Sequence, residues 1–200
     1  MLTRRHWLTT AAALTAALLV ARSAPAAQPL EVAVPSNAVG AIVVAVGGAA
    51  VTIKLDRGLG PAQLKIDGKP VDVTDGLRIQ QPSYLDDPRN APKLGASVRK
   101  ALAAARPELA AEFDANHKAW TRPFVRKVLA WNARLATSPV RGKRVADTHA
   151  RATLLEWAGA TVDPAGQPSP AALARAPKDA AAATLDSYVA YVDALVLALA

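Results

Sequence analysis

The sequence predicts an α/β fold of two small lobes with mostly parallel sheets, joined by a long helical spine. Three observations support this prediction: a strand–helix–strand pattern at residues 30–55, a long helical stretch at residues 87–138, and a second, shorter α/β pattern at residues 139–200. A strand–helix–strand crossover normally joins two parallel strands. The predicted parts are a signal at residues 1–27, a first lobe at 28–86, the spine at 87–138, and a reduced second lobe with a closing helix at 139–200.

The first 27 residues have the features of a cleaved secretory signal. Arg4 and Arg5 supply the charged start, an apolar run follows, and Ala24-Pro25-Ala26 is a small-x-small cleavage site. The arginine pair also resembles a twin-arginine signal, so Sec and twin-arginine export are both open. The apolar run is shorter than the about 20 residues that span a bilayer, and we therefore expect a periplasmic protein.

Charge and cysteine content narrow the function. The net charge is +8, and removal of Arg4, Arg5 and Arg22 with the signal leaves +5 on the mature chain. The remaining basic residues are spread over helix faces, whereas a nucleic-acid binder has a concentrated basic patch, so we expect no nucleic-acid partner. The chain has no cysteine, which excludes disulfides, thiolate metal sites and cysteine nucleophiles.

The first lobe is predicted to begin with a strand at residues 30–35. Ser36 can cap a helix over residues 38–46, which ends at two glycines and leads to a second strand at residues 50–55. Residues 63–73 have two interpretations: a hairpin around Asp67-Gly68, because Asp-Gly is a good turn dipeptide, or a third parallel strand.

The spine is predicted from apolar residues spaced three and four apart. This spacing places them on one face of a helix; they are Leu109, Phe113, His117, Trp120, Phe124, Val128, Trp131 and Leu135. Charged residues, including Glu112, Lys118 and Arg126, occupy the other face. Pro123 is predicted to kink or interrupt the helix near Trp120, and His117 is predicted to be a hydrogen-bonded core histidine.

The second lobe is predicted from shorter segments. We expect a strand at residues 142–148, a helix at 150–158, a short strand at 160–162, one helical turn within the Pro-rich residues 163–177, and a closing helix at 184–199. So few strands predict an exposed sheet edge, which commonly recruits another chain. A homodimer or a complex with another periplasmic protein is therefore a hypothesis.

Four segments, at residues 32–55, 87–120, 145–162 and 167–174, resemble one known family. They are similar, in the same order, to the periplasmic substrate-binding proteins of zinc and manganese ABC importers, the TroA-like family; the Asp-Pro-Arg-Asn-Ala string after Asp86 is the most specific piece. The resemblance implies two lobes joined by a rigid helix, an ABC permease in the inner membrane as the partner, and Zn²⁺ or Mn²⁺ bound in the cleft between the lobes.

The resemblance also implies a ligand set of three histidines and one carboxylate, of which this sequence keeps one. His149 matches the third histidine, whereas residues 56–61 and 81–83 have none at the first two positions, and the late strand that supplies the carboxylate is missing. Asp86 and Asp87 are the candidate substitutes. The alternative is that His149 is a relic residue with a backbone partner, because zinc sites need at least three protein ligands.

Catalysis is not expected. Adjacent carboxylates such as Asp86 and Asp87 point to opposite sides of an extended segment, and Asp87 is instead predicted to cap a helix that begins at Pro88. Three functions are left: a binding protein of a zinc or manganese importer that lacks most of its metal ligands, a non-metal-binding periplasmic partner or regulatory protein on the same scaffold, or a degenerate product without activity.

Overall fold

The computed structural model describes residues 28–75, 77 and 83–200. The predicted signal and the predicted position of the second histidine, at residues 81 and 82, lie outside this part of the chain. In the described part, no helix combines the length and the apolar character that crossing a membrane requires.

The first lobe contains a four-stranded sheet. Its strands are β1 (Leu30–Val34), β2 (Val51–Leu55), β3 (Gln63–Ile66) and β4 (Lys69–Asp72), in the order β2-β1-β3-β4. The pair β1–β2 is parallel, as predicted, with Leu30 opposite Val51, whereas β3 runs antiparallel to both β1 and β4. This sheet is therefore mixed, and the prediction of mostly parallel sheets is wrong for the first lobe. Asp67 and Gly68 both have positive φ and close a tight hairpin, which is the first of the two interpretations of residues 63–73.

Helix α1 (Asn37–Gly47) connects the two parallel strands and is almost entirely buried. Ser36 caps it by accepting a hydrogen bond from the backbone N–H of Val39. A short 3-10 turn, η1 (Gly48–Ala50), then leads into β2. These bounds agree with the prediction to within one residue.

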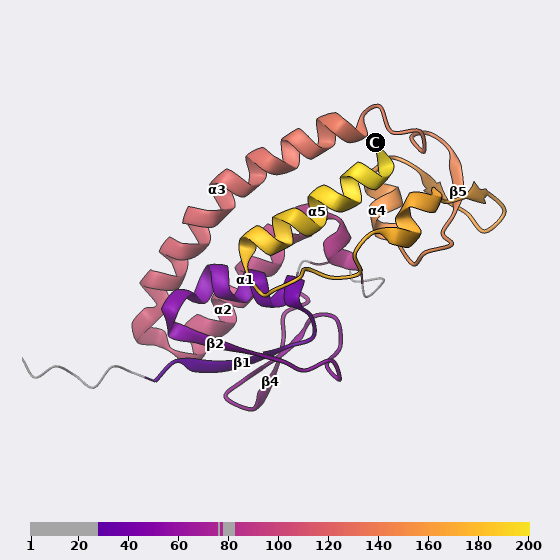
Figure 1. Ribbon diagram of the computed structural model, residues 1–200. Helices are drawn as coiled ribbons and strands as arrows, with labels where there is room; N and C mark the ends of the chain where they lie inside the picture. The colour runs from indigo at the N-terminus through magenta and orange to yellow at the C-terminus, as the bar shows by residue number, and fades with distance from the viewer. Residues whose placement is uncertain (1–27, 76, 78–82) are drawn as a thin grey trace, which may run out of the picture.

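The spine consists of two helices after two short 3-10 turns. The turns are η2 (Tyr84–Asp86) and η3 (Pro88–Asn90), and the helices are α2 (Ala91–Ala105) and, after η4 (Pro107–Leu109), α3 (Ala110–Leu135). In α3 the predicted apolar face is confirmed, because Phe113, Trp120, Phe124, Val128, Trp131 and Leu135 are all buried. Figure 1 shows α3 running the length of the molecule, from the first lobe to the second.

Pro123 does not interrupt α3, which continues through it to Leu135. Both Pro123 and Ala119, the residue whose carbonyl loses its hydrogen bond, are on the exposed face, where water can satisfy that carbonyl. Trp120 and Phe124, on either side of Pro123, are buried. Their burial stabilises the helix enough to outweigh the missing backbone bond.

Helix α3 is attached to both lobes by side-chain amides. Near its start, Asn116 donates to the carbonyl of Val46 at the end of α1 (3.1 Å). Near its end, Asn132 accepts from the indole N–H of Trp157 in the second lobe (2.7 Å). One hydrogen bond at each end thus connects α3 to α1 and to α4.

The second lobe has a small parallel sheet of order β6-β5-β7. Its elements are β5 (Arg144–Ala146), α4 (Ala152–Trp157), β6 (Thr161–Val162), β7 (Gln167–Pro168) and the turn η5 (Ala171–Arg175). Strand β7 was not predicted, because the Pro-rich segment gives no strand pattern. The closing helix α5 (Leu185–Leu199) packs against α1 and α3 (Figure 1), although the sequence division grouped it with the second lobe.

Candidate functional site: the cavity between the lobes

A cavity of about 810 Å³ lies where the parallel strands of both lobes end. Ser36 and Arg57, which follow β1 and β2, line one side, and residues 148–151, which follow β5, line the other. In open α/β sheets, ligands bind beyond the carboxyl ends of the strands. The position of this cavity therefore marks it as the candidate binding site.

A buried ion pair joins the two lobes at this cavity. Arg151, just before α4, donates from Nη1 to Oδ2 of Asp86 in η2 over 2.8 Å, and the two residues are only 4% and 1% exposed. The same Nη1 donates to the hydroxyl of Tyr191 in α5 (2.9 Å), and that hydroxyl donates to the other oxygen of Asp86. The second terminal nitrogen of Arg151 donates to the carbonyl of Pro177. Both oxygens of Asp86, the Tyr191 hydroxyl and both terminal nitrogens of Arg151 thus have partners, as buried charges require.

Burial dominates the electrostatics of this network. It raises the pKa of the Asp86 carboxyl above its usual value, against the opposing charge of Arg151 and the hydrogen bond from Tyr191. Burial also raises the pKa of the Tyr191 hydroxyl, and the neighbouring Asp86 charge adds to that effect. The tyrosine therefore stays protonated and can donate to the carboxylate.

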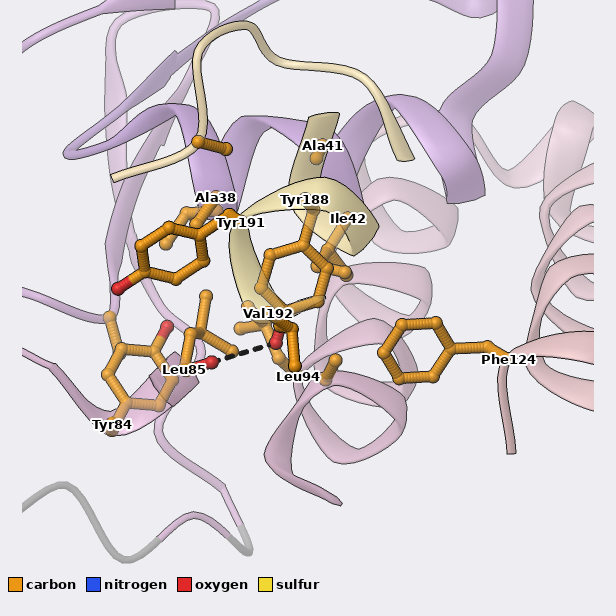
Figure 2. Close-up of a cluster of buried hydrophobic side chains, with 14 of the residues drawn as sticks. Ala38, Ala41, Ile42, Tyr84, Leu85, Leu94, Phe124, Tyr188, Tyr191 and Val192 are labelled. Atoms are coloured by element: carbon orange, nitrogen blue, oxygen red, sulfur yellow. Dashed lines mark hydrogen bonds between the residues drawn. The ribbon is translucent and has the colours of Figure 1, made fainter. Parts of the chain in front are cut away.

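The other two tyrosines of the chain, Tyr188 and Tyr84, lie next to this network. Tyr188 donates its hydroxyl to the backbone oxygen of Leu85 (2.9 Å) and stacks on Phe124 (Figure 2). Tyr84 is 2% exposed and lines the cavity, but its hydroxyl has no hydrogen-bond partner in the described part of the chain. Buried polar groups are nearly always paired, so this enclosed hydroxyl is an exception among the described residues.

The structure brings His149 and Asp86 to the same cavity but not Asp87. His149 is half-buried, and its backbone N–H donates to Asp147 (3.2 Å). Asp87 accepts from the backbone N–H of Arg89 (3.0 Å) and pairs with the guanidinium of the same residue. It therefore caps η3, as predicted, with Pro88 at the first position.

The residues at the cavity do not fit a divalent cation as they are arranged. Both oxygens of Asp86 already accept hydrogen bonds, and one of the donors is a guanidinium, which carries a positive charge and no lone pair. Over residues 28–75, 77 and 83–200, no group of three or more His, Asp and Glu side chains is placed to hold a metal. Metal ligation by His149, Asp86 or Asp87 stays a prediction.

Sequence reasoning missed Arg151 and Tyr191, which complete the network with Asp86. Arg151 stands next to a buried apolar helix, where an isolated charge usually needs a partner, and that was the only available signal. Tyr191 lies on the helical spacing of α5 and is indistinguishable there from an ordinary core residue. No spacing in the sequence connects either residue to Asp86, which is 65 and 105 positions away.

His117 is placed as predicted on the packed side of α3. It is half-buried, its Nε2 lies 3.3 Å from the carbonyl oxygen of Pro92, and its ring meets Trp120 edge-on. This histidine lies outside the cavity.

A scan against protein-family models finds no match to this chain, and a search of curated proteins finds none. The resemblance to the importer binding proteins therefore rests on the four sequence segments alone.

Proposed function

We propose that this chain is an exported protein on a two-lobe solute-binding scaffold, and that it works without a metal as a periplasmic partner or regulatory protein. The observation that supports the proposal is the ion pair of Arg151 and Asp86 between the lobes. A metal-capture protein needs several free ligands in this region. Here the candidate carboxylate is neutralised by a cation that would repel Zn²⁺ or Mn²⁺.

The same contacts favour binding over catalysis. A general base must be free to reach a substrate proton, and both oxygens of Asp86 are occupied. The proposed partner is the ABC permease that the resemblance implies, or another periplasmic protein. Strands β6 and β7 at the edges of the second sheet have two residues each, and such short edges offer little backbone for pairing with a second copy. A homodimer through this edge is therefore the less favoured partner.

Metal capture is the second candidate function. It is favoured by one observation, that His149 and Asp86 line the same cavity. Capture would require Asp86 to leave Arg151 and the cleft to recruit at least one further ligand.

Thermal unfolding of the mature protein with and without Zn²⁺ and Mn²⁺ separates the two functions. A ligand that binds only the folded state at 100 times its dissociation constant adds about 2.7 kcal/mol of stability. We expect no such increase with either metal, in the wild-type protein or in His149→Ala. His117→Ala, outside the cavity, is the control for adventitious binding of zinc to an imidazole. A rise that His149→Ala abolishes and His117→Ala keeps would overturn the proposal and establish metal capture.

A further inference from the structure

The cavity between the lobes carries an excess of positive charge that the buried network does not use. Arg57, in the loop after β2, and Lys178, in the segment before α5, line the cavity with exposed side chains. In the described part of the chain neither makes a salt bridge. The two cations come from segments far apart in the sequence, and no acidic side chain forms a salt bridge with either of them in the described part of the chain.

The acidic residues of the cavity are already committed elsewhere. Asp86 is paired with Arg151. Asp179 accepts hydrogen bonds from the first backbone N–H groups of α1, at Asn37 (2.8 Å) and Ala38 (2.9 Å). A carboxylate at a helix N-terminus is stabilised there by the free N–H groups and the helix dipole. The positive charge of Arg57 and Lys178 is therefore available to a ligand.

The rest of the wall is mostly apolar, and this limits the class of anion that fits the cavity. Most of the other lining residues carry no polar side-chain atom; among them are Pro35, Leu59, Pro61, Leu85 and Leu173. The volume of about 810 Å³ is within the range of small-molecule sites, which combine apolar walls with a few placed polar groups. Inorganic phosphate or sulfate would leave these walls unused, whereas a short organic acid would cover them.

We propose that the cavity binds a small organic carboxylate, with its charge at Arg57 and Lys178 and its hydrocarbon part against the apolar side chains of the wall. This inference rests on the proposed metal-free use of the scaffold and gives it a ligand class. In this proposal the Arg151–Asp86 pair holds the two lobes together next to the ligand and does not contact it.

Calorimetric titration of the mature protein with glutarate and with benzoate tests the proposal. We expect saturable binding of at least one of these acids, no binding of its neutral amide (glutaramide or benzamide), and weaker binding of inorganic phosphate. Arg57→Gln and Lys178→Gln should each weaken binding about tenfold, the usual effect of removing one hydrogen bond to a charged group. Arg126→Gln, on the exposed face of α3, is the matched control and should leave binding unchanged.

The proposal is overturned if neither acid binds, if the amides bind equally well, or if Arg126→Gln weakens binding as much as the cavity variants. Those outcomes leave the metal-free function standing, because the zinc and manganese scans test that separately.

Discussion

Asp86 and Asp87 are neighbours in the chain, but their side chains have different kinds of partner. Asp87 is satisfied locally by Arg89 and caps the next turn, and this role was predictable because an Asp-Pro pair is a common start of a helical segment. Asp86 is satisfied by Arg151 and Tyr191, far away in sequence. Its partner could not be predicted, since nothing in a local pattern specifies which distant charge the fold will bring near.

Tyrosine ionisation provides a prediction at this scale. The protein has three tyrosines, Tyr84, Tyr188 and Tyr191, and burial raises the pKa of each above its usual value. Above pH 10 the unfolded chain loses these protons while the folded chain keeps them. The free energy of unfolding should therefore fall with rising pH, by about 1.4 kcal/mol per pH unit for each tyrosine.

An alkaline titration followed by tyrosinate absorbance and by circular dichroism measures this effect. We expect the absorbance to rise in one step that coincides with the loss of helical signal. Tyrosinate absorbance that appears near pH 10 while the helices are intact would contradict the buried positions of these side chains.

At the scale of elements, the helices were the most predictable part. The buried face of α3 was predicted because spacings of three and four residues identify a helix face without tertiary information. The effect of Pro123 was not, because whether a helix tolerates proline depends on packing on either side of it. Strand β7 was missed for the same kind of reason: its two residues pair with β5 by tertiary placement rather than by any alternation of their own.

The crossing of α2 and α3 gives a prediction at this scale. A Cβ at Gly95 would lie 2.6 Å from Cζ2 of Trp120 and 3.0 Å from Cδ2 of His117. Gly95→Ala should gain up to about 1 kcal/mol of helix propensity but lose about 1–3 kcal/mol by overpacking against the rigid indole. We therefore expect a net loss of stability in urea unfolding.

The Trp120→Leu background is the control for this prediction. Leucine lacks the indole atom at 2.6 Å, whereas the His117 contact at 3.0 Å stays, so most of the cost of Gly95→Ala should disappear there. Equal losses in both backgrounds would show that helix α2 needs glycine for another reason.

At the scale of the whole molecule, the α/β class was predicted, but the strand directions in the first sheet were not. Asp67-Gly68 was recognised as a turn, yet the sequence could not decide between a hairpin and a further parallel strand. The packing of α5 against α1 and α3 could not be predicted either. The pattern of an amphipathic helix shows that one of its faces is buried, but it does not show which element covers that face. The site followed the same rule: the resemblance implied a site between the lobes, whereas Arg151 and Tyr191, which lie there with Asp86, were not predicted.

A double-mutant cycle in urea tests whether Arg151 and Asp86 form a satisfied ion pair between the lobes. Arg151→Met should cost about 3–5 kcal/mol, because it leaves a carboxylate buried without its partner. The double variant Asp86→Ala/Arg151→Met should cost clearly less than the sum of the two single variants. The exposed pair Asp114–Lys118 on α3 is the matched control, with an expected coupling of about 0.3–0.5 kcal/mol. A coupling at Arg151–Asp86 no larger than the control would contradict the account, since it would mean that the two lobes are not joined through this pair.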